Sequence, residues 1–449
     1  MNNKWRQYAK LTFASLIYFC QGATIAAVAP VVSIVSEEDR GIPAYFTGVI
    51  VGQDDVAIFF SSLLLFPYLI NSSNYLKYFI VGCIGSILCN AVFAFTYKVE
   101  DDVVYVNMCL FIRLIEGCAF SSSWISGLPL LMEYIPNREA VVSGITELGV
   151  VMGVVLGPSI SIGLYFLAGY AYPFVFIASL QTVALIGFFL VPSPAALKEG
   201  EGEVVVEVEK SGVDAFLKYY FSGPVQLLTL TMLAATSMIG YTETVLSVEF
   251  HEYMDMSDFE TTVLLSVVGL AYLFTVPVAT YYADRHNFIP VPIGGFALAS
   301  SLLLLGTITR SEPFEKNFEM YAFLLLIAGG SAMTCITPTF ALLYFDCTRK
   351  GVTPIGTLIS GVLNAQFAFG GTIGPVIFGG ILYETVEFHI SCICLGLYIS
   401  VSTAFSFHYM WKEGLLKSSC DCPRHKKAPN ENTTLVEKPK SDESEKEAG

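Results

Sequence analysis

The chain has 449 residues, of which 54% are hydrophobic and only 14% are charged, whereas soluble domains usually have about 25% charged residues. This composition excludes an ordinary soluble protein, because about 20 apolar residues span a bilayer as a helix and the chain could supply about a dozen such spans. The net charge of −15 also excludes a nucleic-acid partner, since phosphate binding needs a basic surface.

Apolar segments follow one another along the chain, separated by connections that carry charged residues, glycine or proline. The first segment follows Lys4, Arg6 and Lys10, and its uncharged run is too long for a cleaved signal peptide, so we expect it to be retained. We predict an all-α membrane protein with twelve transmembrane helices. They cover residues 11–35, 44–70, 76–97, 103–134, 140–168, 172–191, 224–250, 259–283, 288–309, 319–345, 352–383 and 389–411.

The predicted helices form two halves that repeat each other. Gly157-Pro158 is followed five residues after the proline by Gly163, and Gly374-Pro375 is followed in the same way by Gly380. Two parallel repeats of six helices are typical of a transporter that rocks around a site between its halves. The predicted organisation is a cytosolic N-terminus at 1–10, six-helix bundles at 11–191 and 224–411, a cytosolic linker at 192–223 and a disordered cytosolic tail at 412–449.

The basic residues predict the orientation of these helices. With the two termini in the cytosol, the termini and the connections on their side hold 19 of the 24 lysines and arginines, and the opposite connections hold four. This asymmetry is the one expected of cytosolic segments, and a shift to eleven or thirteen spans would break it.

Three motifs resemble those of the major facilitator superfamily. Gly149, Gly153, Gly157 and Pro158 are spaced as in its antiporter motif, in which small residues allow helices to approach closely and the Gly-Pro pair weakens the helix so that it can bend. Segment 282–285, with Asp284 and Arg285, resembles the loop motif whose aspartate pairs with basic residues in one gate state. Segment 113–117 resembles the fourth-helix motif R-x-x-Q-G, with glutamate in place of glutamine.

Within that superfamily the chain is most similar to the vesicular amine transporter branch, and there to the polyamine-transporter-like members of solute carrier family 18. The resemblance is carried by segments 136–174, 336–340, 356–358 and 374–383. It implies a proton-driven exporter of organic cations, such as polyamines, into acidic compartments. The first helix has no aspartate where the monoamine members carry one, so the resemblance does not imply monoamine specificity.

Six charged residues lie in the interior of the predicted spans, away from the span ends, where a charge costs at least about 2.5 kcal/mol and is a functional candidate by default. Arg113 and Glu116 are three residues apart, a spacing that suits either an internal ion pair or a coupling role. Asp54 and Asp55 are adjacent and point about 100° apart, so at most one of them faces a cavity well.

Glu147 is our leading candidate for proton coupling or cation binding. It lies two turns before Gly157-Pro158 and matches a glutamate of the resembling group. Glu243 is a second candidate, because it stands where that group carries an acidic residue. The alternative to a transport role is that Glu243 lies at the end of its helix in contact with water. Carboxylates suit this exchange because a cation and a proton compete for the same negative charge. The polar residues that would orient a substrate amine, or only join helices by hydrogen bonds, are Gln21, Asn364 and Tyr344.

The predicted function is proton-coupled antiport of an organic cation, such as a polyamine or monoamine, by a monomer in a vesicular or endolysosomal membrane. The alternative is a symporter or importer of a neutral or anionic solute, which would use Arg113. An enzyme or receptor fits less well, because the histidines are scattered and twelve spans exceed the seven of common receptors. We predict no cofactor or metal, since the chain shows neither a phosphate-binding loop nor paired zinc-ligand motifs.

Overall fold

The computed structural model describes residues 3–65, 75–135, 138–192, 213–246, 249–250, 256, 258–308, 317–350, 356–383 and 387–416. Within these residues the secondary structure is helical and contains no β-strand. In this described part of the chain, twelve helices are long and apolar enough to cross a membrane, which confirms the predicted all-α fold with twelve spans. For most of the spans, the predicted first and last residues lie within a few residues of the ends of the helix in the structure.

The first half consists of helices that pack on one another around α1 and α6. Its members are α1 (Asn3–Ser33), η1 (Ile34–Asp39), α2 (Ala44–Leu64), α4 (Tyr75–Phe93), η2 (Thr96–Lys98), α5 (Asp102–Tyr134), α6 (Glu139–Ala168) and α7 (Ala171–Leu190). The α1–α6 contact is close because glycines line it. A Cβ at Gly22 would overlap the Val150 carbonyl, and one at Gly153 would overlap the Phe19 carbonyl.

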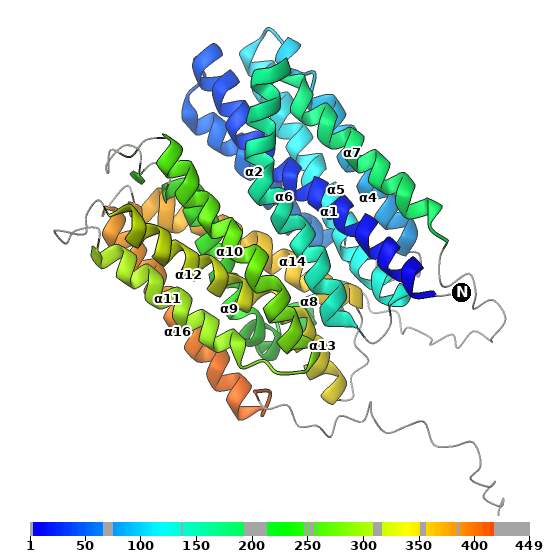
Figure 1. Ribbon diagram of the computed structural model, residues 1–449, viewed down its shortest axis with the longest axis vertical. Coiled ribbons are helices and arrows are strands. Elements are labelled where there is room, and N and C mark those ends of the chain that lie inside the picture. Colours follow the sequence, from blue (N-terminus) through cyan, green and yellow to red (C-terminus); the bar gives the residue numbers. More distant parts are fainter. Residues whose placement is uncertain are drawn as a thin grey trace, which may run out of the picture.

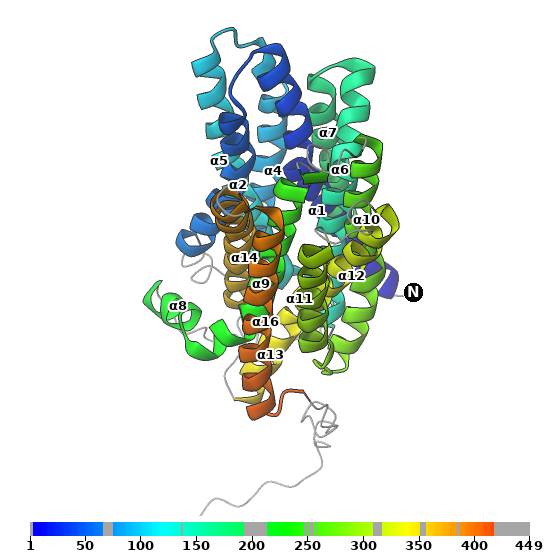
Figure 2. The same ribbon diagram turned by 90° about the vertical axis from the view of Figure 1, so that its left-hand side faces the viewer.

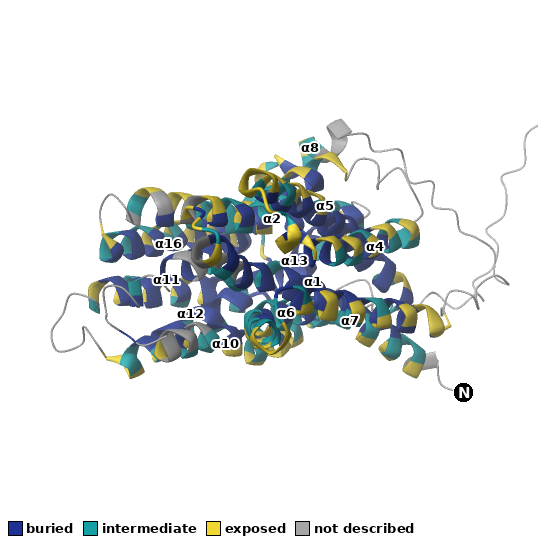
Figure 3. Cartoon of the chain, turned by 90° about the horizontal axis from the view of Figure 1, so that it is seen from above, coloured by how far each residue is buried: buried dark blue, intermediate teal, exposed yellow. Residues whose placement is uncertain are grey.

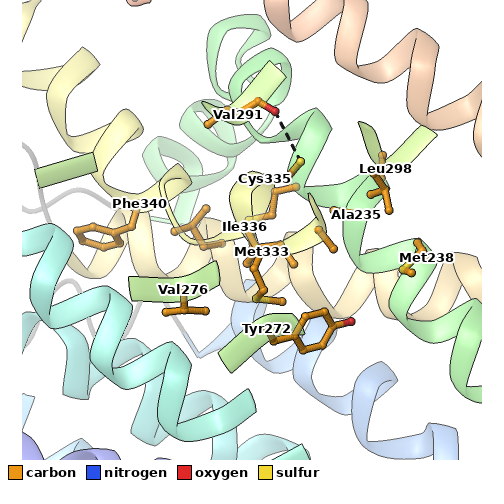
Figure 4. Packing of buried hydrophobic residues seen from close by; sticks show 14 of the residues in the cluster. Ala235, Met238, Tyr272, Val276, Val291, Leu298, Met333, Cys335, Ile336 and Phe340 are labelled. Carbon is orange, nitrogen blue, oxygen red and sulfur yellow. Dashed lines mark hydrogen bonds between the residues drawn. The ribbon is translucent and has the colours of Figure 1, made fainter. Parts of the chain in front are cut away.

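The second half repeats this arrangement with a further short helix before it. Its members are α8 (Val213–Tyr220), α9 (Gly223–Tyr241), η4 (Thr242–Leu246), α10 (Asp258–Asp284), α11 (Pro290–Ile308), α12 (Phe318–Ile336), α13 (Thr339–Arg349), α14 (Gly356–Ile373), η6 (Gly374–Tyr383) and α16 (Phe388–Lys412). Figure 4 shows its core, where Met333 and Ile336 of α12 pack with Tyr272 and Val276 of α10. The Cys335 thiol donates to the Val291 carbonyl there, at 3.7 Å.

The two halves meet along a seam that we define by its helices: α2, α5 and α6 from the first half, and α10, α13 and α14 from the second. Figures 1 and 3 show the halves on the two sides of this seam. We call the end of the molecule at which α1 begins and α16 ends the terminal end. The helices run alternately up and down, so α2, α5 and α10 also end there, and α6 and α14 begin there.

Several predicted spans are less regular than the sequence suggested, and those predicted at 11–35 and 224–250 pass into the π-helices η1 and η4 near their ends. The span predicted at 319–345 is divided into α12 and α13 by a turn at Thr337-Pro338, because proline has no N–H to continue the helix. The span predicted at 352–383 changes from α-helix to π-helix at Gly374, whereas α6 continues as an α-helix through Gly157-Pro158. The expected Gly-Pro irregularity is therefore present in the second half only.

The segment before α9 forms the short helix α8, which lies beside the second half near the terminal end (Figure 2). Tyr219 of α8 forms a 3.3 Å hydrogen bond with Cys347 of α13, and Tyr220 is buried. Most of the predicted linker (193–212) and of the predicted disordered tail (417–449) lies outside the described residues. The boundaries of the two bundles and the cytosolic assignment of these segments stay predictions.

Candidate functional site

A buried charged cluster joins α2 and α5 inside the first half. The Arg113 guanidinium lies 2.7 Å from an Asp54 carboxylate oxygen and 2.7 Å from a Glu116 carboxylate oxygen, and it also donates to the Val51 carbonyl at 3.2 Å. All three charged side chains are buried. The helices approach closely here because a Cβ at Gly117 would lie only 2.6 Å from the Asp54 carbonyl oxygen. The pairing of Arg113 with Glu116 is the one that their spacing allows.

This cluster contains two carboxylates and one guanidinium. Three of its buried polar atoms have no hydrogen-bond partner among the described residues: Asp54 Oδ2, Glu116 Oε1 and Arg113 Nε. With both carboxylates ionised the cluster would carry one uncompensated negative charge, which is costly in a buried position.

Asp55 faces a different neighbour from Asp54. A Cβ placed on Gly371 of α14 would lie 3.3 Å from Asp55 Oδ2, so this carboxylate lies against the second half. The adjacent aspartates therefore point to different partners, as the 100° step of a helix requires. Asp54 belongs to the cluster within the first half, and Asp55 belongs to the seam.

Glu147 lies on α6 beside the seam. The Ser143 hydroxyl donates to its Oε1 at 3.1 Å, and the Thr337 hydroxyl of the second half lies close to the carboxyl group. Its other oxygen, Oε2, is buried and has no hydrogen-bond partner among the described residues. One turn away, a Cβ at Gly144 would overlap the Thr280 hydroxyl of α10, so the two halves are in tight contact here.

The three predicted polar residues have different surroundings. Gln21 exchanges hydrogen bonds with Ser123 inside the first half, at 2.8 and 3.1 Å, which agrees with a packing role. Asn364 of α14 crosses the seam and donates to Ser62 of α2 at 2.9 Å and to Ser121 of α5 at 3.2 Å. Tyr344 is half-buried on α13 and its ring stacks on Phe340.

Sequence reasoning did not single out the hydroxyl groups of the seam. Ser61 donates to Ser121 at 2.7 Å, so Ser61, Ser62, Ser121 and Asn364 form one hydrogen-bonded group across the two halves. The signal in the sequence was the occurrence of consecutive serines inside two apolar spans, at 61–62 and 121–123. The side chains that bond Ser61, Ser62 and Ser121 across the seam and between α2 and α5 lie on other helices, so the sequence alone does not identify them.

Glu243, the remaining predicted carboxylate, lies on η4 directly after α9. The position of its side chain lies outside the part of the chain that the structure describes. Its role in transport stays a prediction.

The glycines of the predicted conformational motifs serve different contacts. Gly149, Gly153 and Gly157 face the backbone of α1, where a Cβ on Gly157 would lie 2.9 Å from the Ala23 carbonyl oxygen. Gly163 has no neighbouring atom within 4 Å of the position of a Cβ, so no close contact requires it. In the second half Gly374 begins η6 and packs on α9, with Pro375 and Gly380 following in the same π-helix.

The predicted gate residues lie at the terminal end of the seam. Asp284, the last residue of α10, lies 3.5 Å from the guanidinium of Arg138, the residue before α6. Arg285 instead lies over the ring of Tyr281, 3.9 Å from its centroid. The Asp284–Arg138 pair joins the two halves and is partly exposed to solvent.

The sequence and the fold are both similar to those of known transporters. Residues 14–375 match the model of the Major Facilitator Superfamily. The MFS-type transporters SLC18B1 of Rattus norvegicus, Mus musculus and Homo sapiens are each 22% identical to the chain, over 85%, 84% and 81% of its length and 82%, 81% and 78% of theirs. The proton:xylose symporter XylE superposes with a TM-score of 0.66 over 92% of this chain and 96% of that chain, at 14% identity.

The family match covers most of the chain and agrees with the twelve apolar helices. The protein is an integral, multi-pass membrane transporter of a small molecule and not an enzyme. Two six-helix repeats that meet at a seam are the architecture in which secondary transporters operate. The chain belongs to the Major Facilitator Superfamily.

Proposed function

We propose that this transporter exchanges protons for an organic cation, of the amine class that includes polyamines and monoamines, by alternating access. The single observation that carries the proposal is the position of Glu147, a carboxylate beside the seam whose buried Oε2 has no hydrogen-bond partner among the described residues. A carboxylate in such a place requires a proton or a cation for neutrality.

The charge balance around the seam favours a cation over an anion as substrate. Deep within α2, α5 and α6 there are four carboxylates, and Arg113 is the one guanidinium that accompanies them in the described part of these helices. Arg113 is already engaged by two of these carboxylates. An anionic solute would therefore meet a surplus of negative charge at this depth.

The contacts between the halves support a state that is closed at the terminal end. Arg138 and Asp284 pair there, and a Cβ at Gly356 of α14 would lie 3.4 Å from Pro129 of α5. In this proposal the substrate leaves or enters from the opposite end, and the terminal end opens when these contacts separate. The sequence prediction of cytosolic termini would make this state closed to the cytosol. The resemblance to vesicular amine transporters supports a vesicular or endolysosomal membrane.

The proposal is tested by transport measurements on purified protein in liposomes with an imposed pH gradient. A panel of labelled amines is compared with neutral and anionic solutes, for the wild type and for Glu147→Gln. The substitution keeps the shape of the side chain and removes its negative charge, so gradient-driven accumulation of the amine should be lost. Glu319→Gln is the matched control, because Glu319 is an exposed glutamate in the first turn of α12.

The same measurement discriminates the alternative function. A symporter or importer of a neutral or anionic solute would accumulate such a solute along the proton gradient, ignore the amines, and depend on Arg113. Normal accumulation of an amine by Glu147→Gln would move the role to another carboxylate, of which Glu243 and then Glu116 are the next candidates.

A further inference from the structure

We propose that the Arg113–Asp54–Glu116 cluster is a second proton-binding site, in which Asp54 and Glu116 share one proton. The geometry supports this directly. One guanidinium pairs with both carboxylates at 2.7 Å, and one oxygen of each carboxylate, Asp54 Oδ2 and Glu116 Oε1, is left buried without a hydrogen-bond partner in the described part of the chain. An ionised carboxylate oxygen can only accept hydrogen bonds. These two buried oxygens lack a donor among the described residues, so one of them can bind a proton.

Charge neutrality determines the number of protons. Two ionised carboxylates and one guanidinium leave a charge of −1, one proton makes the cluster neutral, and two protons leave +1. A neutral cluster is the least costly in a buried position, so one proton is bound and either carboxylate can hold it. In the described part of the chain, the other titratable residues close enough to interact electrostatically with the cluster supply no further cation: Asp55 on α2, which itself lies against α14, Cys89 on α4, and Cys109 and Cys118 on α5.

The two carboxylates differ in how they depend on the conformation of the transporter. Glu116 is on the same helix as Arg113, three residues away, so this pair persists while α5 remains helical. Asp54 comes from α2, which contacts α14 of the other half through the stacked rings of Phe59 and Phe369. Movement of α14 along the seam would therefore displace Asp54 from Arg113 and leave the Glu116 pair in place.

This difference gives the shared proton a role beyond neutralising charge. When Asp54 stays close to Arg113, both carboxylates compete for one guanidinium and the cluster retains its proton. When α2 moves away, the proton leaves with Asp54 or is released to water, and Arg113 and Glu116 remain as a neutral pair. The site is distinct from Glu147, which lies on α6 and contacts Ser143 and not Arg113. It does not depend on the identity of the substrate.

The experiment counts protons without any substrate. Purified protein in lipid nanodiscs is titrated between about pH 4 and about pH 10, and bound protons per molecule are compared for the wild type, Asp54→Asn and Glu116→Gln. Each single substitution should remove the same proton, about one per molecule, because either one leaves a neutral ion pair with Arg113. Glu147→Gln should remove a different proton, so its effect should add to that of Asp54→Asn.

Folding yield supplies the second measurement. Asp54→Asn and Glu116→Gln should each keep the yield and the monodisperse elution of the wild type, because the cluster stays neutral. The double variant leaves Arg113 buried without a carboxylate and should lose most of its yield. The proposal of a shared proton would be overturned if the titration curves of both single variants superimposed on that of the wild type. It would also be overturned if only one of the two variants lost a proton. A loss of yield in both single variants would overturn it as well.

Discussion

The amide nitrogen of Asn364 lies 2.9 Å from the hydroxyl oxygen of Ser62, although 302 residues separate them in the chain. Asn364 is on α14 in the second half and Ser62 is on α2 in the first, so this hydrogen bond crosses the seam. A second bond from the same nitrogen reaches Ser121 of α5 at 3.2 Å. These bonds exist only while the two halves are together at this level, so in the proposed mechanism they stabilise the state that is closed at the terminal end.

Removing the Asn364 side-chain amide should therefore favour opening of the terminal end. Hydrogen bonds between membrane helices contribute about 0.6 kcal/mol each, so the loss of two in Asn364→Ala should raise the open population roughly five- to ten-fold. The population is measured by distances between spin labels placed at the terminal ends of α6 and α10. Ser300→Ala is the control, because the Ser300 hydroxyl donates to the Phe296 carbonyl of its own helix on an exposed face and so does not join the two halves. An unchanged distance distribution in Asn364→Ala would show that these bonds do not bias the equilibrium.

Leucine at Gly157 should stop transport, because its Cβ would lie 2.9 Å from the Ala23 carbonyl oxygen and would separate α6 from α1. Gly374→Leu should have the same effect through the contact of η6 with α9. Insertion into the membrane should persist, since leucine is apolar. Turnover in liposomes is compared with the amount of inserted protein.

The chain offers a matched control for these glycines. Gly163 is on the same helix as Gly157 but has open space where a Cβ would lie, so Gly163→Leu should transport at close to the wild-type rate. Equal loss in Gly157→Leu and Gly163→Leu would show that bending of the helix matters more than the contact with α1.

Exchanging the charges of Arg138 and Asp284 in a double variant should restore the closure of the terminal end that each single charge reversal weakens. The two side chains lie 3.5 Å apart and are partly exposed, so the pair contributes about 0–1 kcal/mol and is weakened by salt. Arg138→Asp and Asp284→Arg should each increase labelling of a terminal-end cysteine at low salt, by no more than about five-fold. The double variant should label as the wild type does, and a sum of the two single effects would contradict a direct pair.

The predicted orientation places residue 201 in the cytosol. A cysteine at Glu201 should therefore resist a membrane-impermeant reagent applied to intact cells and react after permeabilisation, because the basic residues concentrate on this side. A cysteine at Asp101, in the opposite connection, is the control. If the protein is in the plasma membrane, this cysteine should react without permeabilisation. If the protein is in internal vesicles, it should react only after the vesicle membrane is opened. Labelling of the Glu201 variant from outside would reverse the orientation.

Much of the fold follows from the sequence because hydropathy is a local property. Each apolar segment is long enough to cross a bilayer by itself, so the twelve spans could be read without knowing their neighbours. The ionisable residues inside these apolar segments could be identified from the sequence for the same reason. The spacing of Arg113 and Glu116 also predicted their pairing, since helix geometry fixes the relation of residues three apart.

The second partner of Arg113 was decided only by tertiary structure. Asp54 is on another helix, and whether Asp54 or Asp55 faces Arg113 depends on the rotation of α2 about its axis. The π-helix at Gly374 and the continuous helix at Gly157 likewise differ although both carry the same Gly-Pro pair. Helix rotation and packing result from contacts between segments far apart in the chain, so no local pattern specifies them. The sequence by itself determined which residues lie in the membrane, and the packing of the helices decided which of them meet.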